Sequence, residues 1–460
     1  MILQGNFLNM KQREQRTATD GDFELNAGVS PKAKLNFSSK RGGKFLRILA
    51  LTNAFPYPPT SGFQMRTWEV LSALTSLGCE INLLSFSQPE EVNRLGSEVH
   101  QVCRTVELVR HSRRSLTSDP NYLGRLRSLP GSLPFAVTRF QSEDMRLRIA
   151  RWIRSDRIDV ILSETPYPLV NMPAEVSTPV IVNCQNVEHL ILRRYIRSER
   201  SQLRRAYAWV ECRKLERWEK QVCSGANLLF VCSEPDRAVM EKLCPGASVI
   251  MVPNTIDVEH YGPMVESDGT TLLYTGGMDW FPNRDAVEFF VAAILPELRR
   301  LNSRVKLVVA GRPGPDKFHQ WLAKIPDVEF RGPVLDMRVE IARAAVCVVP
   351  LRVGSGTRLK ILEAAAMAKP VVSTSVGAEG LDFTQGKDIL IEDKPVEFAH
   401  VVAGLLRDPQ RCRSLGEAAR RSVEKHYGRP ALGAALRVGL EKIVDVREDI
   451  SEAARDRGPA

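Results

Sequence analysis

Short apolar runs alternate with amphipathic stretches along most of this chain. The first apolar run extends from Phe45 to Leu51, and apolar residues three or four positions apart follow at 66–77. A second, largely apolar run at 79–86 comes directly afterwards. Runs of this length are typical of buried strands, and the spacing between them is typical of a helix. We therefore predict a strand–helix–strand unit with parallel strands, because parallel neighbours need a crossover that is usually helical.

The same alternation repeats and divides the chain into two α/β domains. Strand-like runs continue at 158–162, 179–184, 227–231 and 248–252, and a second series begins at 271–275, after a hinge at Asp268-Gly269. We predict a polar, disordered tail at 1–43, a first domain at 44–267 and a second at 268–427. A final segment at 428–460 is expected to pack back on the first domain through one helical face, formed by Leu432, Leu436, Leu440 and Ile443.

Three further regions show patterns of their own. Residues 190–222 mix many arginines with apolar residues and are predicted to form one long amphipathic helix with a solvated charged face. Residues 100–157 are predicted to be irregular and are rich in arginine. Residues 285–301 have helical spacing, and Pro296 is expected to kink or split that helix.

A glycine loop after a buried strand is the strongest candidate for chemistry. Residues 346–349 are apolar and predict a strand that ends at Pro350. Gly354, Ser355 and Gly356 follow, and they permit a tight turn with exposed backbone N–H groups. Thr357 leads into a helix-prone stretch at 358–367. The loop therefore lies between the C-terminal end of a strand and the N-terminus of a helix, a position that favours anions.

Charged residues in that helix strengthen the expectation of an anion. Arg358 and Lys360 place two cations in the first turn, where like charge is locally unfavourable unless something negative binds. A diphosphate is the natural candidate. Glu363 lies one turn further on and could accept hydrogen bonds from hydroxyl groups. The alternative interpretation is an ordinary glycine turn beside a solvated charged face.

Two more glycine positions fit the same pattern. Gly62 precedes the first predicted helix, and Gly276-Gly277 follow the strand at 271–275. In open parallel sheets, ligands bind outside the C-terminal ends of the strands. We therefore predict a cleft between the two domains with glycine loops facing it.

Composition and charge narrow the class of protein. The net charge of +10 fits nucleic acid, an anionic membrane surface or anionic substrates as partners. Nine scattered cysteines without a Cys-x-x-Cys pair argue for a reducing compartment and against structural zinc. The N-terminus lacks signal-peptide features, and no apolar run approaches membrane-spanning length. A cytoplasmic location is expected, and the arginines are expected to be solvated or, on the alternative, to contact anionic lipid.

The sequence from Gly354 to Leu381, GSGTRLKILEAAAMAKPVVSTSVGAEGL, resembles the donor-site segment of glycosyltransferase family 4. Further similarity lies in the segments that begin at Pro253 (PNTID), Tyr274 (YTGGMDWFPNRDA) and Gln185 (QNVEH). The resemblance covers about residues 45 to 447. It implies the GT-B fold, in which two Rossmann-like parallel-sheet domains face a central cleft.

The family resemblance also implies an activity. It suggests retaining transfer of a sugar, a hexosyltransferase-like reaction, from a nucleotide diphosphate donor to an acceptor hydroxyl. Donors would bind mainly the second domain and acceptors the first. No metal or other cofactor is expected, because basic side chains and helix N-termini would neutralise the diphosphate. Cell-envelope or exopolysaccharide synthesis, with a glycan or lipid-linked acceptor, is the expected setting.

Individual residues receive candidate roles from the loops and the resemblance together. Glu363, Ser355 and Glu164 are the candidate catalytic residues, although Glu164 at a strand end would alternatively cap a helix. The candidate substrate-binding residues are Gly62, Gly276, Gly277, Asn283, Gly354, Gly356, Thr357, Arg358, Lys360, Gln185 and Asn186. His189, in a polar loop, is expected to be solvated.

The sequence departs from the family pattern at four places. The family often has two glutamates separated by seven residues; Glu363 fits the second, but the first falls on Ser355. The family's arginine and lysine after the first strand of the second domain fall near Gly277 and near Asn283 or Arg284. Gln185 takes a histidine position, and the segment 162–164 lacks another histidine. Diphosphate neutralisation would therefore depend more on Arg358 and Lys360.

Three other functions compete with the transferase. A catalytically silent GT-B binder of nucleotide sugars or glycans would explain the missing histidines. A sugar-nucleotide epimerase shares the fold, but its acidic catalytic groups are not evident. A nucleic-acid binder is the most distant, because no reading motif is present and the aromatics among the arginines resemble core anchors.

Overall fold

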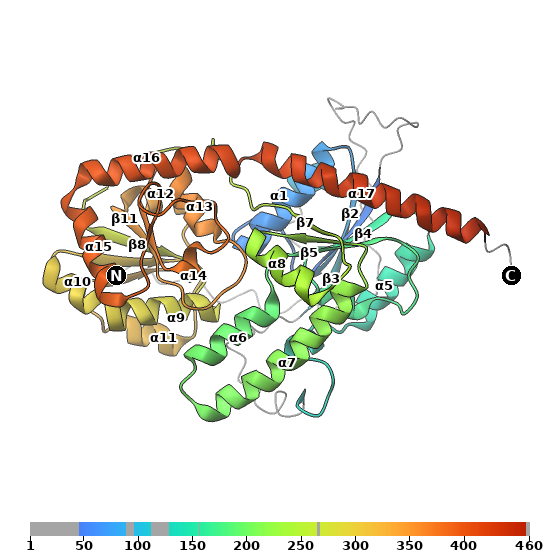
Figure 1. Cartoon of the computed structure of the whole chain (residues 1–460), viewed down its shortest axis with the longest axis horizontal. Coiled ribbons are helices and arrows are strands. Elements are labelled where there is room, and N and C mark those ends of the chain that lie inside the picture. The colour runs from blue at the N-terminus through green and yellow to red at the C-terminus, as the bar shows by residue number, and fades with distance from the viewer. Residues whose placement is uncertain (1–45, 89–95, 112–127, 156, 265–266, 457–460) are drawn as a thin grey trace, which may run out of the picture.

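Two parallel sheets form the framework of the molecule (Figure 1). The computed structural model describes residues 46–88, 96–111, 128–155, 157–264 and 267–456, with side chains described as far as 447. The predicted tail at 1–43 lies outside these ranges. Every pair of neighbouring strands in both sheets is parallel, which confirms the predicted α/β fold class.

The first sheet has seven strands in the order β3-β2-β1-β4-β5-β6-β7. These strands are β1 (Arg47–Thr52), β2 (Glu80–Ser87), β3 (Thr105–Arg110), β4 (Val160–Ser163), β5 (Val180–Cys184), β6 (Leu228–Val231) and β7 (Val249–Met251). The order reverses between β1 and β4. Ligands of doubly wound sheets bind at such a reversal, beyond the C-terminal strand ends.

The second sheet has six strands in the order β10-β9-β8-β11-β12-β13. They are β8 (Thr271–Thr275), β9 (Lys306–Ala310), β10 (Val328–Arg331), β11 (Val346–Val349), β12 (Val371–Ser373) and β13 (Leu390–Ile391). Here the order reverses between β8 and β11. The two glycine segments predicted from the sequence, 276–277 and 354–356, follow these two strands.

Helices cover both faces of each sheet (Figure 1). In the first domain they are α1 (Gly62–Ser76), α2 (Ser97–Val102), α4 (Phe135–Thr138), α5 (Glu143–Arg154), α6 (Glu188–Ser198), α7 (Gln202–Ser224) and α8 (Glu234–Leu243). In the second they are α9 (Phe281–Phe289), α10 (Leu295–Leu301), α11 (Asp316–Leu322), α12 (Met337–Arg343), α13 (Leu359–Ala366), α14 (Ser375–Ala378), α15 (Pro395–Arg407) and α16 (Pro409–His426).

The last helix, α17 (Arg429–Asp456), returns to the first domain (Figure 1). The four apolar residues predicted to share one face, Leu432, Leu436, Leu440 and Ile443, are buried in the same core cluster as β1 and α1. On the same helix a Cβ at Gly439 would lie 2.6 Å from the Phe230 ring, so the helix lies tight against β6. The chain therefore links the domains twice, once before β8 and once before α17.

The predicted single helix at 190–222 is wrong, because two antiparallel helices occupy these residues. They are α6 and α7, and Figure 1 shows the pair projecting as a hairpin. Ser201 caps α7 by accepting a hydrogen bond from Arg204 N, and Ser201 N donates to Glu199 Oε1 at 2.8 Å. These polar contacts satisfy the turn backbone without the glycine or proline that usually marks a break.

Two other regions also differ in detail from expectation. Residues 100–157 were predicted to be irregular, yet the described part contains β3 and α5, with Ser142 as the N-cap of α5. The many arginines of α5 hide the helical pattern in the sequence, although Met145 and Ile149 form a buried face of this helix. The helix at 285–301 is split as predicted: a π-helical segment, Phe290–Ile294, separates α9 from α10, and Pro296 occupies the first turn of α10.

Candidate functional site

The glycine loop after β11 contacts the first domain directly. Gly356 has φ +73°, and a Cβ there would lie 2.4 Å from the carbonyl oxygen of Gln185. A side chain at this position would therefore be strained and would also collide with backbone of the other domain. Only glycine permits this approach.

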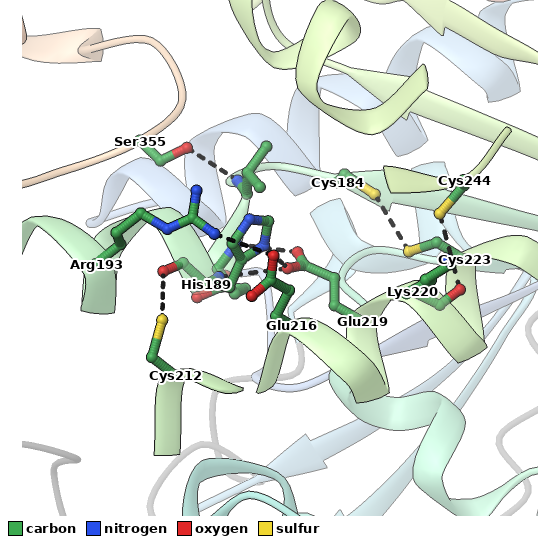
Figure 2. Close-up of polar contacts among 12 residues, drawn as sticks. Cys184, His189, Arg193, Cys212, Glu216, Glu219, Lys220, Cys223, Cys244 and Ser355 are labelled. Carbon is green, nitrogen blue, oxygen red and sulfur yellow. Dashed lines mark hydrogen bonds and ion pairs between the residues drawn. The ribbon is translucent and has the colours of Figure 1, made fainter. Parts of the chain in front are cut away.

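Hydrogen bonds across the domain boundary surround this contact. Ser355 Oγ accepts from the N–H of Val187 at 2.9 Å (Figure 2) and donates to Asp236 Oδ1 at 3.2 Å. Asn254 Nδ2 donates to Thr357 Oγ1. With its amide turned to suit its neighbours, Asn186 donates to Ser355 O at 2.8 Å. The C-terminal edges of the two sheets thus meet where the sequence places the cleft.

Gly62 belongs to the same region. It begins α1, and a Cβ there would lie 3.5 Å from a methyl group of Leu359, the first residue of α13. The structure therefore brings together helix N-termini from both domains. Both carry partial positive charge, so an anion between them would be stabilised.

Arg358 holds the glycine loop in shape. Its guanidinium is buried and donates to the carbonyl oxygens of Ser355 at 2.7 Å, Val376 at 3.1 Å and Gly356. Burial lowers the pKa of Arg358 to about 10. The side chain donates to two carbonyl oxygens of the loop and to one of α14, whereas the sequence suggested a direct contact with diphosphate.

Lys360 and Asn283 meet beside the second glycine segment. Lys360 Nζ donates to Asn283 Oδ1 at 3.0 Å and lies 4.0 Å from the centre of the Tyr274 ring. A Cβ at Gly276 would lie 2.7 Å from Asn283 Nδ2 and 3.0 Å from Lys360 Nζ. Burial, reinforced by the charge of Arg358, lowers the pKa of Lys360 to about 7. A bound anion would therefore favour the charged form of this lysine.

Gly277 completes this segment. Its carbonyl oxygen accepts from Asn283 Nδ2 at 2.9 Å. A Cβ at Gly277 would lie 2.3 Å from Asp279 Oδ1 and 2.9 Å from Arg312 Nη2, which form an ion pair at 3.2 Å. Arg312 therefore brings a cation to the place where the family arginine is missing from position 277, and sequence reasoning did not assign it that role.

Glu363 is half-buried one turn into α13. Its Oε1 accepts a hydrogen bond of 2.9 Å from Tyr261 OH, and burial raises the pKa of Glu363. Tyr261 lies in the link between the domains, and its contact with Glu363 was not predicted. The carboxylate is thus oriented by a phenol while one of its oxygens stays available for other donors.

Glu164 lies in a polar network of the first domain. Its Oε2 accepts from Asn183 Nδ2 at 2.8 Å and from Gln185 Nε2 at 3.2 Å. Gln185 also donates to Thr67 Oγ1 at 3.0 Å. Glu164 Oε1 is buried and has no hydrogen-bond partner among the described residues. Burial raises the pKa of Glu164 to about 7, against the lowering effect of nearby Arg66.

Arg66 organises this network and was missed by sequence reasoning. It is buried in α1 and donates to Asn183 Oδ1 at 2.9 Å, Val252 O at 2.9 Å and Asn254 Oδ1 at 2.8 Å. Asn254 in turn donates to Thr357 in the glycine loop. The one available signal was an asparagine, Asn183, inside an otherwise apolar strand.

Two models of known protein families match this chain. Residues 61–255 match the model of the glycosyl transferase 4-like domain, and residues 269–408 match the model of glycosyl transferases group 1. The chain belongs to glycosyltransferase family 4.

Among curated relatives, a Klebsiella pneumoniae protein described as an uncharacterized 44.6 kDa protein in the cps region is 22% identical over 373 residues. That alignment covers 77% of this chain and 90% of the relative. A D-inositol 3-phosphate glycosyltransferase of Kineococcus radiotolerans is 28% identical over 274 residues, or 52% of this chain and 61% of the relative.

Solved structures show that this glycosyltransferase has the GT-B fold. Sucrose-phosphate synthase from Thermosynechococcus elongatus superposes with a TM-score of 0.65 at 17% identity, covering 87% of this chain and all of that one. Anabaena HepE, in complex with UDP and glucose, gives 0.60 at 14% identity, covering 86% and 99% of the two chains.

His189 of this glycosyltransferase is buried, so its predicted solvation is wrong. Its Nδ1 lies 2.6 Å from Glu219 Oε2 (Figure 2). Glu219 projects from α7 and also accepts from the backbone N–H groups of Glu188 at 3.0 Å and His189 at 3.3 Å. The carboxylate therefore caps α6, and the histidine packs beneath this cap because α7 folds back along α6.

No helix in the described part of the chain is long and apolar enough to cross a bilayer.

Proposed function

We propose that this glycosyltransferase moves a sugar from a nucleotide diphosphate donor to an acceptor hydroxyl, with retention of configuration and without a metal. The observation that carries the proposal is the half-buried Lys360, held by Asn283 beside Gly276 and the N-terminus of α13. A lysine whose pKa is lowered to about 7 by burial gains its charge most readily when an anion enters.

The donor side would stabilise the leaving diphosphate. Negative charge grows on that group in the transition state, and preorganised cations and N–H groups are most effective there. Lys360 would contact the diphosphate, and the loop at 354–357 would offer backbone N–H groups. The positive charge of Arg358, which donates to carbonyl oxygens of the loop, would add to the electrostatic stabilisation of the diphosphate. Glu363, oriented by Tyr261, would accept hydrogen bonds from the donor sugar.

The acceptor side would lie on the first domain. Glu164 Oε1 has an unused lone pair in a buried setting, and Gln185 and Asn186 lie beside it and the glycine loop. A hydroxyl that donates to Glu164 Oε1 would satisfy that oxygen. In front-face retaining transfer the departing phosphate takes the acceptor proton, so the absence of histidine at 185 would not prevent the reaction.

The acceptor would be a glycan or a lipid-linked sugar in polysaccharide synthesis. One relative is described as a protein in a cps region, and HepE was crystallised with UDP and glucose. The α6–α7 hairpin exposes Leu203 (85%) and Trp209 (55%) close in sequence to Arg200, Arg204 and Arg205. Apolar residues among cations suit an anionic membrane surface, where each cation contributes about 1 kcal/mol. We infer action in the cytoplasm, with this hairpin at the inner face of the membrane.

Flotation with vesicles tests the membrane contact. The wild-type protein should float with vesicles that contain phosphatidylglycerol, and Leu203→Glu/Trp209→Glu should not. Val438→Glu, an exposed apolar site on α17, is the control. Equal flotation with neutral vesicles would remove the electrostatic part of the proposal.

A panel of nucleotide sugars tests the activity. We expect one donor to release its nucleoside diphosphate in the presence of chelator, and NMR of the product should show the anomeric configuration of the donor. No release with or without lipid extract, together with measurable nucleotide binding, would favour a catalytically silent binder. Gln185, which takes a histidine position of the family, is the observation that favours this second candidate.

A further inference from the structure

Ser355 makes both of its side-chain hydrogen bonds to the other domain. It is buried in the glycine loop, accepts from Val187 N at 2.9 Å and donates to Asp236 Oδ1 at 3.2 Å (Figure 2 shows the first of these). Asp236 lies in the first turn of α8, and its Oδ2 accepts from Ser233 Oγ at 2.6 Å. A carboxylate of the first domain therefore accepts a hydrogen bond from the glycine loop of the second, which we propose to bind the donor.

Charges on both sides of the boundary surround Asp236. Burial raises its pKa, while Ser233, Arg358 and Ser355 lower it and Glu379 opposes ionisation. Glu379 is paired with Arg194 of the first domain at 2.6 Å. Each domain thus contributes one cation and one anion to this contact, with Arg358 and Glu379 on the second and Arg194 and Asp236 on the first.

We propose that Asp236 supplies, through the Ser355 hydroxyl, the carboxylate that the family resemblance places at position 355 itself, and so acts as a positioning residue for the donor loop. A serine hydroxyl followed by one hydrogen bond extends about as far from the backbone as a glutamate side chain. The carboxylate function has thus moved from the loop to the facing domain. This inference rests on the proposed sugar transfer.

The geometry of the glycine loop depends on contact between the two domains. Because Asp236 and Ser355 belong to different domains, the loop reaches its final geometry only when the domains are in contact. Donor binding to the second domain alone does not require this contact, but turnover does. Loss of Asp236 should therefore lower kcat more than it raises the KM for the donor.

A purely structural role for Asp236 is the competing explanation. Carboxylates in the first turn stabilise a helix, and Asp236 is one of two acids in the first turn of α8. Asp388 provides a matched control in the second domain. It is equally buried, and its oxygens accept from Thr384 N at 2.6 Å and Ser422 Oγ at 2.7 Å, with no part in the glycine loop.

Hydrogen exchange tests the contact without any substrate. In Asp236→Asn and in Ser355→Ala, amide exchange at 354–357 and at Val187 should be about five-fold faster than in the wild type. Asp388→Asn should leave both segments unchanged. Unchanged exchange in Asp236→Asn, or equal acceleration in Asp388→Asn, would overturn the inference even if no donor is ever found.

Nucleoside diphosphate release then tests the role in turnover. Asp236→Asn and Ser355→Ala should each lower kcat roughly ten-fold, and the double variant should be no worse, because the two groups act as one unit. Ser355→Glu should be worse than either, since two carboxylates would meet, whereas Ser355→Glu/Asp236→Ser should regain activity to within about three-fold of wild type.

The outcomes separate the two proposals. Losses that multiply in the double variant, or a swap that recovers nothing while the protein stays folded, would overturn the role of Asp236. A wild-type enzyme that releases nothing from any donor would instead defeat the proposed function, and the exchange measurement would still decide the contact.

Discussion

Lys360 Nζ lies 3.0 Å from Asn283 Oδ1, and the two side chains come from different helices that start at the C-terminal edge of the second sheet. This pair has no carboxylate partner at hydrogen-bond distance within the described residues. Burial lowers the pKa of the lysine to about 7, so its amine is partly neutral near pH 7. A neutral amine that becomes an ammonium when an anion binds would give the donor site its selectivity for a charged leaving group.

Binding of a nucleoside diphosphate should therefore take up a proton. At pH 8 the free lysine is mostly neutral, and the bound anion raises its pKa, so calorimetry of UDP binding in buffers of different ionisation enthalpy should show uptake of up to about one proton. Lys360→Met should abolish the uptake. Identical heats in all buffers for the wild type would contradict this account of Lys360.

Gly356 should tolerate no side chain, because a Cβ would collide with the backbone of the other domain. Gly386 also has a positive φ but faces no neighbour, so it serves as a control for backbone strain alone. Gly386 has φ +81° with no atom within 4 Å of a built Cβ, whereas Gly356 has φ +73° and faces Gln185 O at 2.4 Å. Gly386→Ala should lose about 1 kcal/mol of stability and keep its activity. Gly356→Ala should lose roughly 100-fold in turnover, because the glycine loop, which we propose to bind the donor, is displaced. Similar kinetics for the two variants would contradict the contact.

Glu164→Gln should stabilise the protein while it lowers activity. The folded pKa of about 7 lies above the ordinary value of 4.5, so the native state holds more protons between these values and stability falls as pH rises through this window. The neutral amide escapes this loss, which is on the order of 3 kcal/mol above pH 7. Urea unfolding should show a more stable variant at pH 8 and little difference near pH 4.5. A variant that is less stable at pH 8 would refute the assignment.

The ion pair between Arg194 and Glu379 should couple the domains weakly. Arg194 also donates to Gly354 O, and the pair is only partly exposed. Each alanine variant should lower the free energy of unfolding by about 1 kcal/mol, and the double variant by less than the sum. Strictly additive losses in a double-mutant cycle would show that the pair contributes nothing as a pair.

The fold was predictable because its determinants are local. Apolar runs with helical stretches between them identify parallel strands, and the segment at 354–356 signals a strand–turn–helix junction by its glycines alone. The break between α6 and α7 escaped prediction because Ser201 and Glu199 make it with side-chain hydrogen bonds, and neither residue is a strong helix breaker in sequence.

The site was only partly predictable because its contacts join distant residues. Lys360 and Gly276 were singled out separately, and the sequence does not show that they touch. Ser355 and Asp236 are 119 positions apart, and no periodicity links them. The burial of single residues was not predictable either. His189 packs against the carboxylate that caps α6, and Arg358 donates to a carbonyl oxygen of the glycine loop.

The most direct measurement is nucleoside diphosphate release by wild type, Glu363→Ala and Lys360→Ala with the donor that the panel identifies. Glu363 is oriented by Tyr261 and Lys360 by Asn283, and we propose that both act at the donor. We predict release by the wild type and at least a 100-fold lower rate in each variant, with folding preserved by circular dichroism. Release that proceeds at the wild-type rate in both variants would contradict the proposed donor site.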